Sequence, residues 1–164
     1  MKSGLKFIAL AFLTLAPLST YAQSNVAHIN VQQLISEMPE VIAAQNELAK
    51  LEKDYTTQID NAFKEFQTKA QSYSADAANQ TDVTNQARQK ELESMQTNLQ
   101  EFRDSAAQEL QKKQMDLMTP LLEKARNAIT KVGQEQGFNY VIDSSPNGGI
   151  ILADGKDLIE DVKR

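Results

Sequence analysis

Apolar side chains recur at intervals of three and four residues over two long stretches that are almost free of glycine and proline. This spacing places them along one face of an α-helix, as in the seam of a coiled coil. The first stretch contains Val41, Leu48, Leu51, Tyr55, Ile59, Phe63, Phe66, Ala70 and Tyr73, and the second contains Leu92, Met95, Leu99, Phe102, Ala106, Leu110, Leu117, Leu121, Ala128 and Val132. The sequence therefore predicts two helices of about 36 and 55 residues, roughly 54 and 82 Å long.

The apolar seam disappears between Tyr73 and Leu92, where Val83 is the only large apolar residue. Residues 74–82, SADAANQTD, gather side chains that favour turns and helix caps. We therefore expect an antiparallel helical hairpin with its tip near this segment. One uninterrupted helix is the alternative, but it would keep the two ends of the chain too far apart to meet.

Short elements are predicted at both ends of the helical hairpin. Residues 25–31, NVAHINV, alternate as a strand does, and QQLISEM follows as a brief helical turn before Pro39 begins the first long helix. Gly137 is expected to end the second long helix. The last segment, DGKDLIEDVKR, is expected to form a short amphipathic helix.

Residues 137–152 predict a β-hairpin. Phe138, Tyr140 and Ile142 alternate along a first strand, PNGG supplies the turn, and Ile150 to Leu152 form the return strand. Three short strands per chain are close to the lower limit for independent stability, and they leave sheet edges exposed. We therefore expect an obligate oligomer in which strands from several subunits join one body.

The body of this oligomer is assigned to residues 23–38 and 115–164, and the hairpin arm to residues 39–114. From Met115 onward a second apolar stripe lies beside the first, and so wide a face must be buried against something larger than one helix. Pro120 lies between the two regimes and is expected to bend the helix. The candidate oligomerisation residues are Val26, Ile29, Val31, Met118, Leu122, Ile129, Tyr140, Ile142, Ile150 and Leu152.

The first 22 residues have the layout of a secretory signal peptide. Lys2 and Lys6 precede an apolar run over residues 7–18, and Ala22 precedes the expected cleavage site. The run is about a dozen residues long, whereas a bilayer-spanning helix needs roughly 20. We therefore expect an exported chain, with an uncleaved membrane anchor as the alternative. Because the sequence has no cysteine, lipid attachment at the cleavage site, disulfides and thiolate metal sites are excluded.

Charge and motif content exclude several classes of function. Without Lys2 and Lys6, 15 basic residues face 22 acidic ones, and this balance argues against a nucleic-acid partner. No catalytic constellation occurs, and His28, the single histidine, is interpreted as a strand residue rather than a ligand or base. We therefore expect neither an enzyme nor a cofactor or metal. The acidic residues near the C-terminus are interpreted as helix caps and solvated surface: Asp143, Asp154, Asp157, Glu160 and Asp161.

The aromatic and methionine side chains of the two long helices have two interpretations. They either fill the seam inside each arm or stay partly accessible because an isolated pair of helices cannot cover them fully. In the second case several arms would frame a cavity with apolar spots, which suits a promiscuous binder. The candidate binding residues are Phe63, Phe66, Tyr73, Met95 and Phe102.

The mature chain resembles the Skp/OmpH family of periplasmic chaperones. The resemblance lies in VAHINVQQLI, MPEVIAAQNELAKLE, AITKVGQEQGFNYVID, GGIILA and KDLIEDV, and it runs from about Val26 to Val162. It implies a jellyfish-like trimer of the α+β class, with a small β-barrel body built from strands of all three subunits and helical arms that enclose a cavity. It also implies an ATP-independent holdase, which binds unfolded outer-membrane proteins in that cavity and prevents their aggregation.

The arms differ in charge from those of well-known family members, which are strongly basic. Residues 39–136 carry 12 basic and 16 acidic side chains, which argues against contact with anionic lipid or lipopolysaccharide. A structural or adaptor coiled coil of the cell envelope is the alternative function. That function needs a docking motif at the tip, and SADAANQTD contains no apolar anchor.

Overall fold

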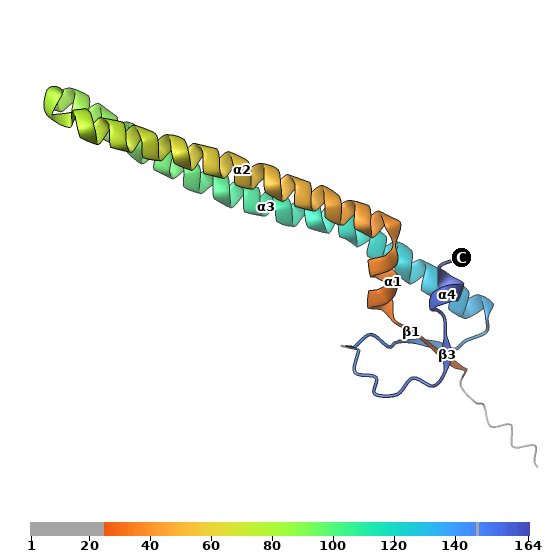
Figure 1. Ribbon diagram of the computed structural model, residues 1–164. Coiled ribbons are helices and arrows are strands. Elements are labelled where there is room, and N and C mark those ends of the chain that lie inside the picture. Colours follow the sequence, from red (N-terminus) through yellow and green to blue (C-terminus); the bar gives the residue numbers. More distant parts are fainter. Residues whose placement is uncertain (1–24, 147) are drawn as a thin grey trace, which may run out of the picture.

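The computed structural model describes residues 25–146 and 148–164, so the expected signal peptide lies outside the described residues. The elements follow in the order β1 (Val26–Ile29), α1 (Val31–Glu37), α2 (Pro39–Asp76), a 3₁₀ turn η1 (Ala77–Asn79), α3 (Asp82–Glu135), β2 (Tyr140–Asp143), β3 (Lys156–Asp157) and α4 (Ile159–Val162). Figure 1 shows α2 and α3 as a long pair that projects from a small group of strands and short helices. The chain is thus mostly helical with a small sheet, as its sequence predicts.

The helix boundaries follow from local chemistry. Met38 is extended (φ −67°, ψ 123°) and separates α1 from α2, because the ring of Pro39 disfavours the helical conformation in the residue before it. The two long helices have 38 and 54 residues, hence lengths of about 57 and 81 Å. The chain reverses at residues 77–81, where the Thr81 hydroxyl caps α3 by accepting a hydrogen bond from the Thr84 N–H at 3.2 Å. Pro120 lies inside α3 without interrupting it.

The small sheet contains three parallel strands in the order β2-β1-β3. Val26 lies opposite Tyr140, and His28 lies between Ile142 on one side and Asp157 on the other. Neighbouring parallel strands require a long crossover connection. Here the entire helical hairpin is that connection, since it joins β1 to β2. The pairing therefore brings both ends of the hairpin back to one sheet.

One face of the sheet packs against helices and forms the core. Ala27 and Ile29 of β1 contribute to this core, and the other buried members of the cluster are Leu34, Ala125, Leu158 and Ile159. The end of α3 lies so close to β2 that a Cβ added at Gly133 would meet the Val141 side chain at 2.8 Å. The core thus unites β1, α1, α3 and α4, and it excludes the long exposed part of the hairpin.

Gly137 ends α3, as the sequence predicts. Its φ of +74° is a left-handed conformation that glycine adopts without steric cost. The N–H groups of Gly137 and Phe138 donate to the carbonyl oxygens of Gln134 and Gly133 at 3.0 and 2.9 Å, the paired bonds of a Schellman motif. The chain therefore turns sharply from α3 into β2.

The predicted C-terminal β-hairpin is wrong. Residues 150–152 form no strand, and the third strand is Lys156–Asp157, which pairs with β1 and not with β2. The aliphatic run resembles a buried strand, but it pairs neither with β1, whose two edges are occupied by β2 and β3, nor with the outer edge of β2. Ile151 is consequently fully exposed, and Leu152 is 82% exposed. These residues belong to a loop between β2 and β3.

Candidate functional site

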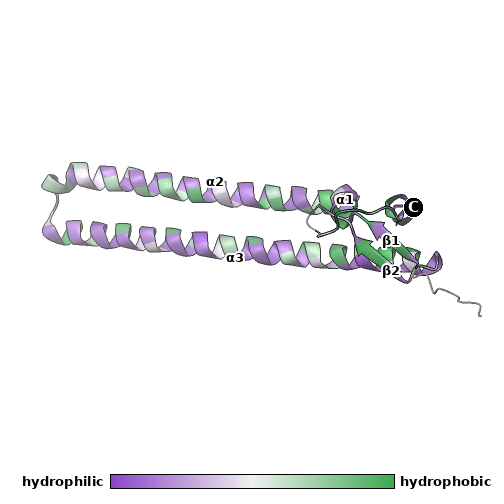
Figure 2. Cartoon of the chain, turned by 90° about the horizontal axis from the view of Figure 1, so that it is seen from below, coloured by the Kyte–Doolittle hydropathy of each residue, from purple (hydrophilic) through white to green (hydrophobic). Residues whose placement is uncertain are grey.

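Two parts of the molecule expose large apolar side chains. We call residues 39–114 the arm, and the remaining described residues the body. Figure 2 shows hydrophilic residues dominating the arm and hydrophobic ones gathered in the body. Across residues 25–146 and 148–164, no helix is long and apolar enough to cross a membrane.

The second face of the sheet is uncovered in the single chain. Val26, Tyr140 and Ile142 project from it and are all exposed, Tyr140 by 63%. They share this face because Val26 lies opposite Tyr140 in a parallel register and side chains alternate along each strand. Parallel sheets are normally covered on both faces. This open face, defined by these three residues, therefore has the character of an interface.

His28 fastens the loop between β2 and β3 to the sheet. Its Nδ1 lies 3.2 Å from the Ser144 hydroxyl, and its Nε2 lies 3.1 Å from the carbonyl oxygen of Gly155. Because a carbonyl oxygen only accepts, Nε2 carries a proton and donates to it. The histidine thus holds both ends of the loop that presents Ile151 and Leu152. The sequence predicts a strand at His28 but not this role, because its hydrogen-bond partners lie more than a hundred residues away along the chain.

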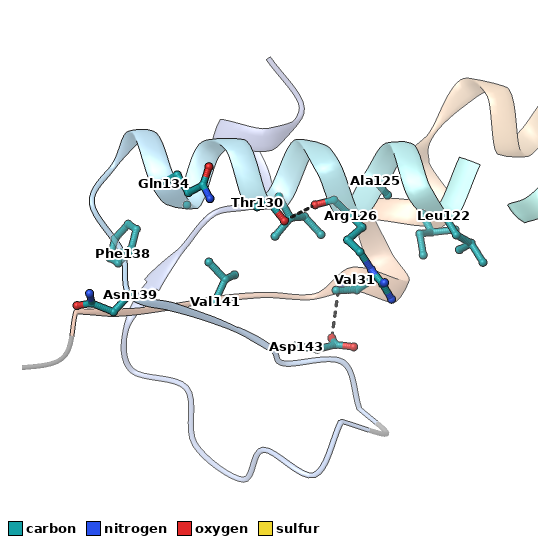
Figure 3. Close-up of a pocket in the computed structure, with 13 residues that line it drawn as sticks. Val31, Leu122, Ala125, Arg126, Thr130, Gln134, Phe138, Asn139, Val141 and Asp143 are labelled. Atoms are coloured by element: carbon teal, nitrogen blue, oxygen red, sulfur yellow. Dashed lines mark hydrogen bonds between the residues drawn. The ribbon is translucent and has the colours of Figure 1, made fainter. Parts of the chain in front are cut away.

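A groove of about 560 Å³ runs between α1, the end of α3 and β2. Figure 3 shows Val141 pointing from β2 toward α3, with Leu122 at one end of the groove. At its rim, Asp143 accepts hydrogen bonds from the Ser145 hydroxyl at 2.6 Å and from the Val31 N–H at 3.3 Å. The bond from the Ser145 hydroxyl is the main reason that the pKa of Asp143 lies below its usual value. The groove thus combines apolar and polar side chains, and its lining includes both the anionic Asp143 and the cationic Arg126.

The candidate oligomerisation residues fall into distinct places. Val26, Tyr140 and Ile142 form the open face. Val31, Leu122 and Ile129 line the groove between α1, the end of α3 and β2. Ile150 and Leu152 lie on the loop, and Met118 is half-buried on α3. Ile29 is different, because it is only 1% exposed and packs in the core of its own chain. Its side chain has no surface that a second copy can reach, so we remove it from the candidate interface.

Charged and polar contacts hold the two helices of the arm together. Glu91 of α3 accepts hydrogen bonds from Lys69 at 2.5 Å and from the Tyr73 hydroxyl at 2.6 Å, both on α2. The bond from Lys69, followed by that from Tyr73, lowers the pKa of Glu91. Closer to the tip, Arg88 pairs with Asp76 at 3.0 Å and lies over the Tyr73 ring. These contacts fix the register of α2 against α3.

The five candidate binding residues differ in how far the arm covers them. Phe102 is half-buried against the Tyr55 ring, with 6.0 Å between ring centroids, and Tyr73 is half-buried and hydrogen-bonded. Phe66 and Met95 are half-buried as well. Phe63 is 40% exposed and lines, with Phe66, a groove of about 450 Å³ between α2 and α3. The arm therefore buries part of its aromatic surface and leaves the ring of Phe63 accessible.

The acidic residues near the C-terminus act locally. Asp157 accepts a hydrogen bond from the Ile159 N–H at 3.0 Å just before α4, although the N-cap residue of this helix is Leu158. Asp161 pairs with Lys156 at 3.0 Å. In the part of the chain that the structure describes, no cluster of three or more acidic or histidine side chains could hold a metal ion.

The sequence of this chain matches that of a known protein family. The family model described as outer membrane protein (OmpH-like) matches residues 25–164. The chaperone protein Skp of Yersinia enterocolitica is similar to this chain, with 26% identity over 156 residues. That alignment covers 92% of this chain and 90% of the relative. The similarity thus includes both the arm and the body.

Proposed function

Because this chain belongs to the OmpH-like family, we propose that it is an ATP-independent periplasmic holdase, which binds unfolded outer-membrane proteins and prevents their aggregation. The observation that carries this proposal is the arm, a projecting helical pair whose own packing leaves Phe63 accessible. The similarity to a chaperone named Skp supports it. Residues 1–22, as a signal peptide, would direct the chain to the periplasm.

Client binding is proposed to rest on many weak contacts along the arms. Phe63, Phe66, Tyr73, Met95 and Phe102 supply apolar surface, and methionine adapts to irregular partners. Each contact alone is weak, but linked contacts raise the effective concentration of the next one. An unfolded chain could thus be held without a single tight site and released without ATP. The acidic arm argues against anionic lipid or lipopolysaccharide as a partner.

A homotrimer is proposed to form the cavity. Its support is the open face of Val26, Tyr140 and Ile142 together with the exposed loop residues Ile150 to Leu152, which are apolar surfaces without cover in the single chain. In a closed ring these surfaces pair between subunits, and strands from three chains complete a small β-barrel. The three arms would then project from one body and enclose the client.

An aggregation assay tests the proposed function. An outer-membrane β-barrel protein is diluted from urea into buffer without ATP, and light scattering is followed with and without the mature chain. We expect suppression at about one trimer per client, and weaker suppression by Phe63→Ser, which removes the accessible ring. Val83→Ser removes an exposed apolar side chain outside the seam and serves as the control. If the wild-type protein does not reduce scattering, the alternative of a structural coiled coil is favoured.

A further inference from the structure

The groove beside Phe63 has an unusual lining for this acidic arm. Its apolar part is formed by Phe63, Phe66 and Leu99, and three uncharged polar side chains contribute to the rest. Arg103 is the single charged residue in the lining. We call this site the arm groove. An apolar surface beside one cation is suited to a ligand that carries an apolar group and an anionic group close together.

The guanidinium of Arg103 is available to such a ligand. Several cations of the arm are engaged, as Lys113 is with Glu47 at 2.7 Å and Arg88 with Asp76 at 3.0 Å. Within residues 25–146 and 148–164, Arg103 has no ion pair, although Asp104 is its neighbour in the sequence. Asp104 instead accepts a hydrogen bond from Gln100 at 3.0 Å. The arm thus leaves one exposed cation in an aromatic groove.

A second groove on the arm shows the contrast. It has a volume of about 470 Å³ and is lined by both acidic and basic side chains, among them Lys113 with its partner Glu47. A ligand carboxylate would compete there with the carboxylates of the protein itself. In the arm groove the lining contains no carboxylate. Anionic ligand groups are therefore favoured at Arg103 and not along the arm as a whole.

We propose that the arm groove binds client segments in which a carboxylate lies two positions away from an aromatic side chain. The aromatic ring packs against Phe63 and Leu99, and the carboxylate accepts hydrogen bonds from Arg103, whose planar guanidinium matches its geometry. In an extended segment, residues i and i+2 share one side and lie about 6.6 Å apart. Arg103 then determines which client segments are preferred, an inference that rests on the proposed function.

Paired peptides test this preference with the full mature protein. Two fluorescent, unstructured peptides differ only in having Asp or Lys two positions after a phenylalanine, and their Kd values are measured by anisotropy at low salt. We expect the Asp peptide to bind roughly threefold more tightly, the size of an exposed ion pair. In Arg103→Gln the ratio of the two Kd values should be close to one, and in Arg103→Glu the Lys peptide should bind more tightly than the Asp peptide. Lys53→Glu makes the same charge change outside the groove and should leave the ratio unchanged.

The possible outcomes separate this inference from the proposed function. If the ratio of the two peptide Kd values is the same in the wild type and in both Arg103 variants, the proposed role of Arg103 is wrong, even if aggregation is still suppressed. A ratio that changes as much in Lys53→Glu would show that only the overall charge of the arm matters, which also contradicts the inference. If neither peptide binds and aggregation is not suppressed, both proposals are refuted. Phe63→Ser should weaken both peptides alike, because it removes the apolar contact and keeps the cation.

Discussion

Leu158 is fully buried in the core of the body. It is 0% exposed and belongs to the core cluster that joins β1 to the helices. Leu158→Ala leaves a cavity there, and we expect a loss of about 3 kcal/mol in the free energy of unfolding. Urea denaturation at fixed protein concentration, followed by tyrosine fluorescence and circular dichroism, measures this loss. Val83→Ala, at an exposed position, should change stability by less than about 0.5 kcal/mol.

Asp76 makes the tip of the arm sensitive to acid. The hydrogen bond from Arg88 is the main reason that the pKa of Asp76 lies below its usual value of 3.8. A carboxyl group whose pKa is lowered by folding stabilises the fold at neutral pH, and this contribution is lost as the pH falls through the folded pKa. We therefore expect faster hydrogen exchange near the tip below about pH 4, after correction for the intrinsic rate.

Asp76→Asn is the matching variant for the tip. It should show faster exchange already at pH 7, because the ion pair with Arg88 is gone, and a smaller further change on acidification. The remaining change is expected because Glu91 also has a lowered pKa, caused first by its bond from Lys69. Asp60→Asn alters an exposed carboxylate of α2 and serves as the control. An acid response as large in Asp76→Asn as in wild type would contradict this assignment.

At the scale of elements, Pro120 is a candidate hinge within α3. The helix continues through this residue, but proline lacks the N–H that would donate to the carbonyl of residue 116. Pro120→Ala restores this hydrogen bond, so we expect a stiffer helix and a narrower spread of arm positions. Spin labels at residue 83 of the subunits give this spread as a distance distribution. A distribution as broad as that of the wild type, with Thr119→Ala as control, would remove Pro120 as a hinge.

The helices were predictable from sequence, and part of the sheet was not. The seam, Pro39, the turn-forming residues 74–82 and Gly137 are local signals, and the boundaries of α2 and α3 lie at or near them. The third strand could not be predicted, because Lys156–Asp157 has only two residues and no apolar pattern. Its position depends on β1, more than a hundred residues earlier. The aliphatic residues 150–152 gave the opposite error, since apolar character alone does not distinguish a paired strand from an exposed loop.

The candidate site was predictable in part. Aromatic residues of the arm were recognisable from the seam, but their different exposure depends on how α2 packs against α3. Phe102 packs against Tyr55, whereas Phe63 lines an open groove. Arg103 carries no sequence signal, because many charged residues follow the same helical period. It became a candidate only when the structure showed it beside Phe63 without an ion pair among the described residues.

For the whole molecule, the central claim is that three chains share one body and hold one unfolded client between their arms. The open face of the sheet is the test position, since Ile142 is exposed in the single chain and is expected to be buried between subunits. Ile142→Glu should therefore fold but remain monomeric, because a charge buried at an apolar interface is costly. Val83→Glu adds the same charge at an exposed position of the arm and should leave assembly intact.

Native mass spectrometry tests this claim most directly. The mature chain is mixed with an outer-membrane β-barrel protein diluted from urea, and the masses of the intact complexes are recorded. We predict a complex of three chains with one client, and free trimers when the client is omitted. Ile142→Glu should give monomers and no client complex. Wild-type monomers that bind no client, or a trimer that never acquires the mass of a client, would contradict the account.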